Sequence, residues 1–331
     1  MKAIFLMVLL CTAQQPSASS SNSKAINKFR EIDKKEADDL LSLGASFDVQ
    51  SQQIKRIVSC SLEGKSCGDK LFTTLQQCNS LEQVTLMDCT IDGDEIKKIC
   101  HQRVKAIRII NCKISKGAIE AVLTAKGLKF VDLTGSIPDG FELTTAISDS
   151  ITYINLSNNY IGEKYFSKLL HDNINYLDLS FCDFENKKDL NKLSQVKGLK
   201  TLILSGINME TKHFNLSELS DIAIETVDLS RCNLSKEHIS DLAKFKNILN
   251  LDISSNALDD SIFGYINKMK NIVYLNVSNN FITTNGINII SDLDSIATIV
   301  CKETSVTDLF YNNKIRKKLK DNFMKIILED E

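Results

Sequence analysis

The chain of 331 residues repeats one eleven-residue pattern along most of its length. The pattern reads apolar-x-x-apolar-x-apolar-x-x-(Asn or Cys)-x-apolar, and copies from Leu81 onward begin 23, 24, 23, 23, 25, 25, 24, 24 and 24 residues apart. One such unit cannot bury its apolar side chains alone, so each unit must be covered by the next. The repeat therefore predicts a solenoid with one continuous core and a parallel sheet of short strands. Clear copies lie at 81–91, 104–114, 151–161, 174–184, 224–234, 248–258 and 272–282, degenerate ones at 128–138, 199–209 and 296–306, and an irregular first one at 54–64.

Copies such as INYLDLSFCDF (174–184) and IVYLNVSNNFI (272–282) resemble the leucine-rich repeat family, and the resemblance covers about residues 54–306. NNFITTNGINII (279–290) and NCKISKGAIEAVL (111–123) are most similar to its ribonuclease-inhibitor-like branch. The resemblance implies an α/β leucine-rich-repeat solenoid of about 10–11 repeats. Its curved parallel sheet would line the concave side, short helices of two or three turns would cover the convex side, and helical caps would close the ends.

The Asn or Cys position is expected to point inward at the turn after each strand. An amide there can satisfy backbone groups that the turn leaves without partners. A small buried thiol is a recognised substitute in the family that the pattern resembles. The residues at this position include Asn159, Asn256, Asn280, Cys89, Cys112, Cys182 and Cys232.

Segments with helical spacing separate the strands. Ile119, Val122 and Leu123 form one apolar set, and other sets include Phe166 with Leu169 and Ile239 with Leu242. Residues suited to cap helix N-termini precede several segments, namely Ser115, Ser235 and Thr283.

The ends of the chain differ from the repeats. Residues 1–20 combine a basic start, a short apolar stretch and a polar Ser-rich segment, which is typical of a secretory signal peptide cleaved near Ala13. The alternative is an apolar tail on a cytoplasmic protein. Cys11 permits a lipoprotein interpretation, which Leu10 disfavours because the bacterial motif has a small residue there. We expect an N-terminal helical cap over 21–53 and a C-terminal helical cap over 307–331, in which a helix from Thr307 or Asp308 carries Ile315, Leu319, Phe323, Ile326 and Ile327.

Little in the sequence indicates catalysis, a cofactor or a metal. The four histidines (His101, His171, His213, His238) fall in separate repeats without paired ligand spacing, and motifs for phosphate, dinucleotide or serine-hydrolase chemistry are missing. A formal charge of −2 disfavours nucleic-acid binding. The N-terminal apolar stretch is too short to cross a membrane, and the sequence has no second long apolar run. Ten cysteines leave open a choice between disulfides and buried reduced thiols. Disulfides are expected first among Cys60, Cys67 and Cys78 near the N-terminal cap, and the spacing of adjacent repeats also permits one between Cys89 and Cys112.

Candidate binding residues lie on the concave face, because strand side chains alternate between the core and this face. Counting the first apolar residue of a copy as zero, we expect positions one, two, four, six and seven to face outward. Position two supplies three consecutive aromatic residues, position four is rich in Asp, and position six is almost all Ser or Thr, small enough to leave room for a protruding partner. Rings flanked by acids are typical of interface hot spots, although they could instead only pack on one another. The candidates are Arg108, Phe130, Asp132, Tyr153, Tyr176, Asp178, Phe181, Asp228 and Tyr274.

We therefore expect a monomeric, non-catalytic protein-interaction module that is secreted or exposed at the cell surface and binds a protein partner on its concave sheet. The alternative is an intracellular leucine-rich-repeat scaffold or adaptor whose N-terminus is not a signal peptide. An enzyme would need an appended domain, for which the repeats leave no residues.

Overall fold

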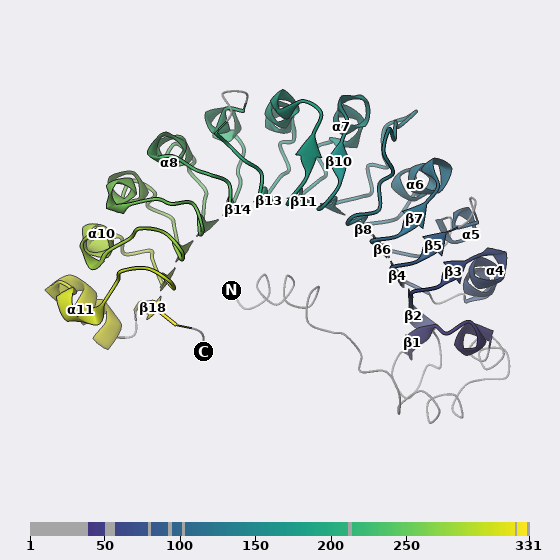
Figure 1. Ribbon diagram of the computed structural model, residues 1–331, viewed down its shortest axis with the longest axis horizontal. Helices are drawn as coiled ribbons and strands as arrows, with labels where there is room; N and C mark the ends of the chain where they lie inside the picture. The colour runs from purple at the N-terminus through teal and green to yellow at the C-terminus, as the bar shows by residue number, and fades with distance from the viewer. Residues whose placement is uncertain are drawn as a thin grey trace.

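The computed structural model describes residues 39–49, 57–78, 81–91, 95–100, 103–210, 214–321 and 323–329. The chain winds into an arc, with the strands along the inner edge and the helices along the outer edge (Figure 1). In the described residues one sheet has thirteen strands in the order β1-β2-β4-β6-β8-β9-β11-β13-β14-β15-β16-β17-β18. All neighbours after β1 pair in parallel, so the predicted α/β solenoid with a curved parallel sheet is confirmed.

Each repeat contributes one short strand to the sheet before the chain turns toward the convex side. The strands of the main sheet are β1 (Ser46–Val49), β2 (Ile57–Glu63), β4 (Gln83–Met87), β6 (Ala106–Ile110), β8 (Phe130–Asp132), β9 (Tyr153–Asn155), β11 (Tyr176–Asp178), β13 (Thr201–Ile203), β14 (Thr226–Asp228), β15 (Asn250–Asp252), β16 (Tyr274–Asn276), β17 (Thr298–Val300) and β18 (Lys325–Ile327). Two small parallel sheets follow the turns: β3 (Ser66–Cys67), β5 (Thr90–Ile91) and β7 (Lys113–Ile114), and β10 (Tyr160–Ile161) with β12 (Asp183–Phe184).

The convex side carries α-helices in some repeats and 3₁₀ helices in others. The α-helices are α4 (Asp69–Gln77), α5 (Lys97–Cys100), α6 (Lys116–Leu123), α7 (Glu163–Leu169), α8 (Lys236–Leu242), α9 (Phe263–Ile266), α10 (Thr284–Ile289) and α11 (Asn313–Lys320). The 3₁₀ helices are η1 (Lys187–Gln195), η2 (Leu216–Leu219), η3 (Asp260–Ile262), η4 (Ile290–Asp292) and η5 (Asp308–Phe310). The predicted caps are confirmed where Ser115 accepts from the Ala118 N–H at 3.1 Å and where Thr283 accepts from the Asn285 N–H at 3.2 Å.

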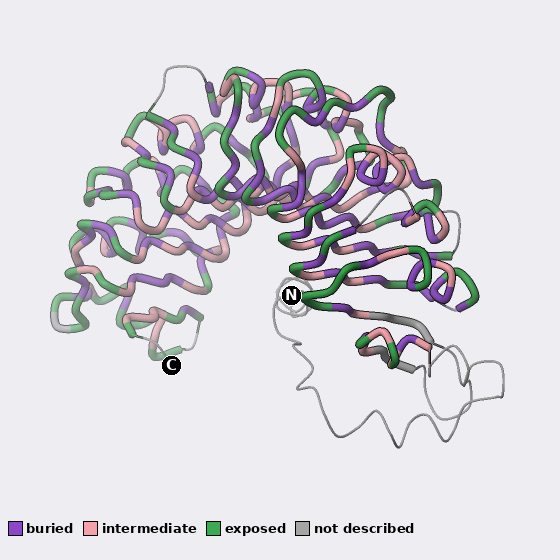
Figure 2. Tube along the Cα trace, turned by 45° about the vertical axis from the view of Figure 1, so that its right-hand side comes forward, coloured by how far each residue is buried: buried purple, intermediate pink, exposed green. Residues whose placement is uncertain are grey.

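The core fills the space between sheet and helices, and buried residues recur in every turn of the solenoid (Figure 2). Each strand sends its middle side chain into this core, as Leu177 does, and the apolar side chain two residues later, Leu179, follows it. The facing helix contributes residues such as Phe166 and Leu169, which are fully buried. Stacking therefore buries the apolar face that no single repeat could bury.

The Asn or Cys position points inward, as predicted. Asn256 Nδ2 donates to the carbonyls of Leu229 at 2.8 Å and Ile253 at 3.0 Å, and its Oδ1 accepts from the Cys232 N–H at 2.9 Å. The thiol of Cys232, at the same position one repeat earlier, donates to the Leu204 carbonyl at 3.1 Å. Leu204 is the residue equivalent to Leu229. A thiol therefore replaces part of the amide's hydrogen bonding. The eight cysteines whose side chains the structure describes, Cys67, Cys78, Cys89 and Cys112 among them, are free thiols, so Cys89 and Cys112 form no disulfide.

The residue just before the Asn or Cys position adopts the left-handed backbone conformation in ten successive repeats, with φ between 50° and 76°. Only Gly adopts this conformation without steric cost, and Asn and Asp tolerate it. The residues are Asp88, Asn111, Gly135, Asn158, Phe181, Gly206, Arg231, Ser255, Asn279 and Glu303. The stacked turns therefore impose a backbone shape that three of these side chains, Phe181, Arg231 and Glu303, would not choose alone.

Both ends differ in part from the predicted helical caps. The predicted signal peptide and most of the predicted N-terminal cap lie outside the described residues. In the described part of this cap, residues 39–42 are helical, as predicted. The strand β1, which pairs antiparallel with β2, was not predicted there. At the other end the helix does not continue to Ile326 and Ile327. It ends at Lys320, and β18 joins the sheet because Lys325 N–H donates to the Ala297 carbonyl at 2.8 Å. Added strands cover sheet edges that would otherwise expose backbone groups.

Candidate functional site

The concave face is built from the two outward positions of each three-residue strand. The sheet register aligns these positions from repeat to repeat, so that Phe130, Tyr153 and Tyr176 face one another on β8, β9 and β11. Two residues later, Asp132, Asn155 and Asp178 form a second aligned column. The spacing in the sequence thus brings these candidate residues together as predicted.

The three rings form a stacked ladder. The ring centroids of Phe130 and Tyr153 are 3.9 Å apart with planes at 15°, and those of Tyr153 and Tyr176 are 3.9 Å apart with planes at 8°. Each ring is half-buried, because its neighbours cover its faces while its edge stays at the surface. The ladder is therefore a rigid apolar strip on the concave side. Aromatic strips of this kind bind partners with little loss of side-chain freedom.

Arg108 on β6 closes one end of this ladder. Its guanidinium carbon lies 4.5 Å from the centroid of the Phe130 ring, in cation–π geometry. The same side chain faces Asp132 across the β6–β8 pair, and its charge lowers the pKa of that carboxyl. Burial has the larger effect, so the pKa of Asp132 is raised above its ordinary value.

The acids at position four each bind their own turn. Asp178 Oδ1 accepts from the Ser180 N–H at 2.8 Å and from the Ser180 hydroxyl at 2.6 Å. Asp252 makes the same pair of contacts with Ser254, at 2.9 and 2.6 Å. This short-range bonding explains the Asp-x-Ser sequence of the repeats, a hydrogen-bonded turn that favours Asp and Asn.

The serine column is not the open surface that strand alternation predicts. Ser157 and Ser180 are 8% exposed and Ser205 is 9% exposed. Where position four is Ile203, the Ser205 hydroxyl instead lies 2.8 Å from that of Ser230 in the next repeat. These three serines are therefore buried between repeats, whereas Ser230, Ser254 and Ser278 of the same column are half-buried, so the outward position expected for the column is met only in part.

Burial and repulsion act on the carboxylates of the middle repeats. Burial raises the pKa of Asp178, and nearby Asp132 adds to the increase. At Asp228, burial and then the charge of Asp252 raise the pKa to about 6. These two residues are paired in register on β14 and β15, so the two acids face each other directly. Loss of water contact disfavours the charged form, and a like charge disfavours it further.

The remaining candidates lie apart from the ladder. Tyr274 is half-buried on β16, and burial followed by the charges of Asp252 and Asp228 raises its pKa to about 12. Phe181 stands after β11 in the left-handed turn and is 49% exposed. Its ring lies against Gly206 in the turn of the next repeat and takes no part in the stacking of Phe130, Tyr153 and Tyr176.

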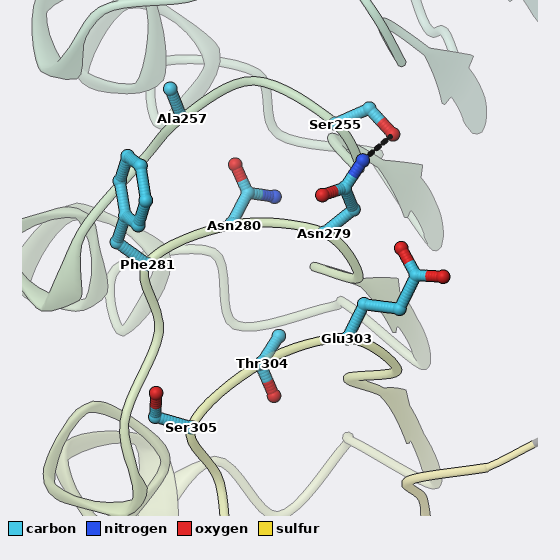
Figure 3. Close-up of a pocket in the computed structure, with 8 residues that line it drawn as sticks. All are labelled: Ser255, Ala257, Asn279, Asn280, Phe281, Glu303, Thr304 and Ser305. Carbon is cyan, nitrogen blue, oxygen red and sulfur yellow. Dashed lines mark hydrogen bonds between the residues drawn. The ribbon is translucent and has the colours of Figure 1, made fainter.

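A pocket that the sequence analysis did not identify lies on the loops that follow β15, β16 and β17 (Figure 3). Its volume is about 430 Å³. Phe281, 72% exposed, stands on its rim between the smaller Ala257 and Ser305. The sequence signal for this pocket is an aromatic residue among small residues in the loops, whereas the repeat pattern directs attention to the strands. The pocket is lined by Ser255, Ala257, Asn279, Asn280, Phe281, Glu303, Thr304 and Ser305.

The described part of the chain contains no group of three His, Cys, Asp or Glu side chains placed to hold a metal ion. His171 and His238 lie in different repeats, and His238 Nδ1 accepts the Ser235 N–H at 2.9 Å in a helix cap. His101 and His213 lie outside the described residues. Of the helices that the structure describes, none combines the length and apolar character that crossing a bilayer requires.

Comparisons with known proteins find two receptor like proteins that match part of the sequence. No family model matches the chain. Receptor like protein 24 of Arabidopsis thaliana is 30% identical over 143 residues, which are 42% of this chain and 16% of that protein. Receptor like protein 23 of the same plant is 29% identical over 124 residues, 35% of this chain and 14% of that protein. The matched stretch thus spans less than one fifth of either relative.

The fold of the chain is shared by a solved structure. A complex of TLR13 with the single-stranded RNA ssRNA13 aligns with a TM-score of 0.55 and 18% identity, over 82% of this chain and 41% of that chain. The internalin inlF of Listeria monocytogenes aligns over 93% of this chain and 97% of that chain, with a TM-score of 0.48 and 11% identity. The chain has the leucine-rich-repeat fold.

Proposed function

We propose that this chain is a non-catalytic interaction module that binds a protein partner on its concave sheet. The observation that carries the proposal is the stacked ladder of Phe130, Tyr153 and Tyr176, closed at one end by Arg108. Aromatic and arginine side chains dominate the binding energy of protein interfaces, and a preordered strip loses little freedom on binding. The receptor like proteins that match part of the chain support a role in recognition.

The charge of the concave face favours a protein over a nucleic acid. Asp132, Asp178 and Asp228 lie along the face, and phosphate backbones bind through basic side chains instead. TLR13 was crystallised with single-stranded RNA, but the likeness to that chain concerns the fold. A single-stranded RNA probe is therefore expected not to bind.

The proposal is tested by capture with a matched pair of double variants. The purified chain is immobilised, and proteins retained from its source are identified by mass spectrometry. Tyr153→Ala with Tyr176→Ala removes two rings of the ladder, whereas Tyr160→Ala with Phe281→Ala removes two exposed rings outside the concave sheet. We expect the first variant alone to lose the partner. Full recovery by a first variant that remains folded in a thermal melt would refute the proposal.

We also propose that the module is exported, on the signal-peptide pattern of residues 1–20. Free thiols and an oxidising compartment are compatible here because the thiols are buried. Burial raises the pKa of Cys100, Cys182, Cys232 and Cys301 to about 12, which keeps these thiols protonated and unreactive. Sequencing the N-terminus of the mature protein tests the proposal, since export requires a new N-terminus near Ala13.

A second candidate is an intracellular leucine-rich-repeat adaptor. The observation in its favour is the set of eight free thiols, because reduced cysteines are typical of the cytosol. An intact Met1 on protein recovered from the cytosolic fraction would decide for this candidate. In either location the binding face is the same.

The short convex helices lead us to propose that the repeats are of the ribonuclease-inhibitor-like kind. α4 and α6, of nine and eight residues, support this assignment, whereas η1, of nine residues, and η2, of four, are 3₁₀ helices. The repeat of 23–25 residues leaves room for about two helical turns.

A further inference from the structure

The aromatic column of the concave face is interrupted after Tyr176. The register places Thr201, Thr226 and Asn250 at the same position in the next three repeats, and the column resumes at Tyr274. Small side chains thus separate two tyrosines by four strand spacings, roughly 19 Å. An α-helix or a loop of a partner, about 10 Å across, fits between them.

The neighbouring column over the same repeats is acidic. It reads Asp178, Ile203, Asp228, Asp252 and Asn276, from β11 to β16. Positions two, four and six of these five repeats contain no basic residue. On the flanks, Lys200 is paired with Glu225 at 3.0 Å and Arg231 lies exposed in its turn.

These carboxylates are not neutralised within the part of the chain that the structure describes. Its ion pairs do not include Asp178, Asp228 or Asp252. The Oδ1 of each acid accepts the N–H of the serine two residues later, and Asp252 Oδ2 also accepts from Asn276 Nδ2 at 2.7 Å. Burial and mutual repulsion raise the pKa of Asp228 to about 6. A cation placed over this column would relieve that repulsion.

We propose that the concave surface between Tyr176 and Tyr274 binds a positively charged segment of a protein partner, with arginine or lysine side chains placed over Asp178, Asp228 and Asp252. This inference rests on the proposed function, since it assumes that the concave sheet is the binding face. It adds the chemistry of the partner and the repeats that the partner contacts.

The chain contains an internal example of the same recognition. Arg108 places its guanidinium 4.5 Å from the ring of Phe130 while it faces Asp132 on the adjacent strand. The arginine thus lies on an aromatic ring of one strand while its charge acts on the carboxylate two residues later in the same strand. Tyr176 with Asp178 on β11 repeats this pair of positions, and Tyr274 lies beside Asp252 on the neighbouring strand. An arginine of the partner would make there the contacts that Arg108 makes in the chain itself.

The experiment titrates the purified full chain with a fluorescent peptide that carries three arginines spaced by glycine and serine. The comparison peptide has glutamine in place of each arginine. Asp178→Asn with Asp228→Asn tests the column, and these substitutions preserve the fold because asparagine occupies the same position at Asn155 and Asn276. The matched control is Glu163→Gln with Glu218→Gln, which changes the net charge equally on the convex side.

We expect the arginine peptide to bind and the glutamine peptide not to bind. Asp178→Asn with Asp228→Asn should weaken binding by about tenfold, and the control pair by less than about twofold. Tyr176→Leu should weaken binding while Tyr176→Phe retains it, because the ring face makes the contact. Equal weakening in both double variants, or no binding of the arginine peptide, would overturn the proposal. If a captured partner still depends on Tyr153 and Tyr176 in that case, the concave face binds a partner of other chemistry and the proposed function stands.

Discussion

The ring of Phe181 fills the space that a side chain on residue 206 would need. A Cβ built on Gly206 would lie 2.4 Å from Cδ1 of Phe181, closer than real atoms approach. The two residues occupy the same left-handed position in consecutive repeats, with φ of 54° and 76°. Gly206 therefore serves two purposes, because it accepts the backbone conformation and leaves room for the neighbouring ring of Phe181.

Gly206→Ala is expected to lower the free energy of unfolding by about 1–2 kcal/mol, from left-handed strain and displacement of the ring. In a Phe181→Ala background the ring is absent, so Gly206→Ala adds only backbone strain. The free energy of unfolding should then fall by less. Urea denaturation of the four proteins in this cycle measures the difference. Equal losses in both backgrounds would show that the ring does not contribute.

Asn256→Ala should destabilise the chain by about 3 kcal/mol or more. The amide bonds the backbone of Leu229, Ile253 and Cys232, and its removal leaves these buried groups without partners. Asn256→Cys should cost less, because the thiol of Cys232 makes part of this network one repeat away. Thermal and chemical denaturation would rank the three proteins. A cysteine variant no more stable than the alanine variant would contradict the assigned role of the thiol.

Asp228 should make the chain less stable as the pH rises from about 4 to about 6. Its pKa is about 6 in the folded chain and near 3.9 when unfolded, so the folded state binds more protons in this range. Asp228→Asn should therefore raise stability at neutral pH by about 1–2 kcal/mol and flatten the dependence. Asp259→Asn is the control of opposite sign, since its hydrogen bonds from Ser261 lower the pKa of Asp259. Denaturation midpoints across this pH range test both.

His171 should make the chain less stable as the pH falls, whereas Asp228 makes it less stable as the pH rises. Burial lowers the pKa of this imidazole, and its Nδ1 accepts the Asn173 N–H at 3.2 Å. The unfolded chain binds the proton more readily, so this contribution to stability is lost as the pH falls below about 6.5. His171→Gln should reduce that loss. NMR titration of the imidazole, with a midpoint at or above the free value, would contradict this assignment.

The repeat pattern was sufficient to predict the parallel sheet, the buried amide column and the alignment of Phe130, Tyr153 and Tyr176. These features follow from a fixed period, because equal spacing places equal positions side by side. The burial of Ser157, Ser180 and Ser205 did not follow from it. Strand alternation places position six outward, whereas the turn after the strand directs these hydroxyls to the neighbouring repeat and to the acid two residues earlier.

The ends of the solenoid were also beyond the pattern. Ile326 and Ile327 have a spacing that suits a helix, but pairing with β17 places them in a strand. Whether such a segment forms a strand depends on a sheet edge that the rest of the fold places beside it, and the local sequence does not determine where that edge lies. Likewise the left-handed backbone at Phe181, Arg231 and Glu303 is imposed by stacked turns and overrides the preference of each residue.

Site-specific photo-crosslinking tests the concave binding face most directly. A benzoylphenylalanine replaces Tyr176 in one protein and Phe281, on the loop beside the pocket, in another, and each is irradiated with the captured partner. Binding on the concave sheet predicts a crosslinked product from position 176 and little or none from position 281. A crosslink from position 281 alone, with position 176 silent, would place the partner on the loops and contradict the assignment of the concave sheet.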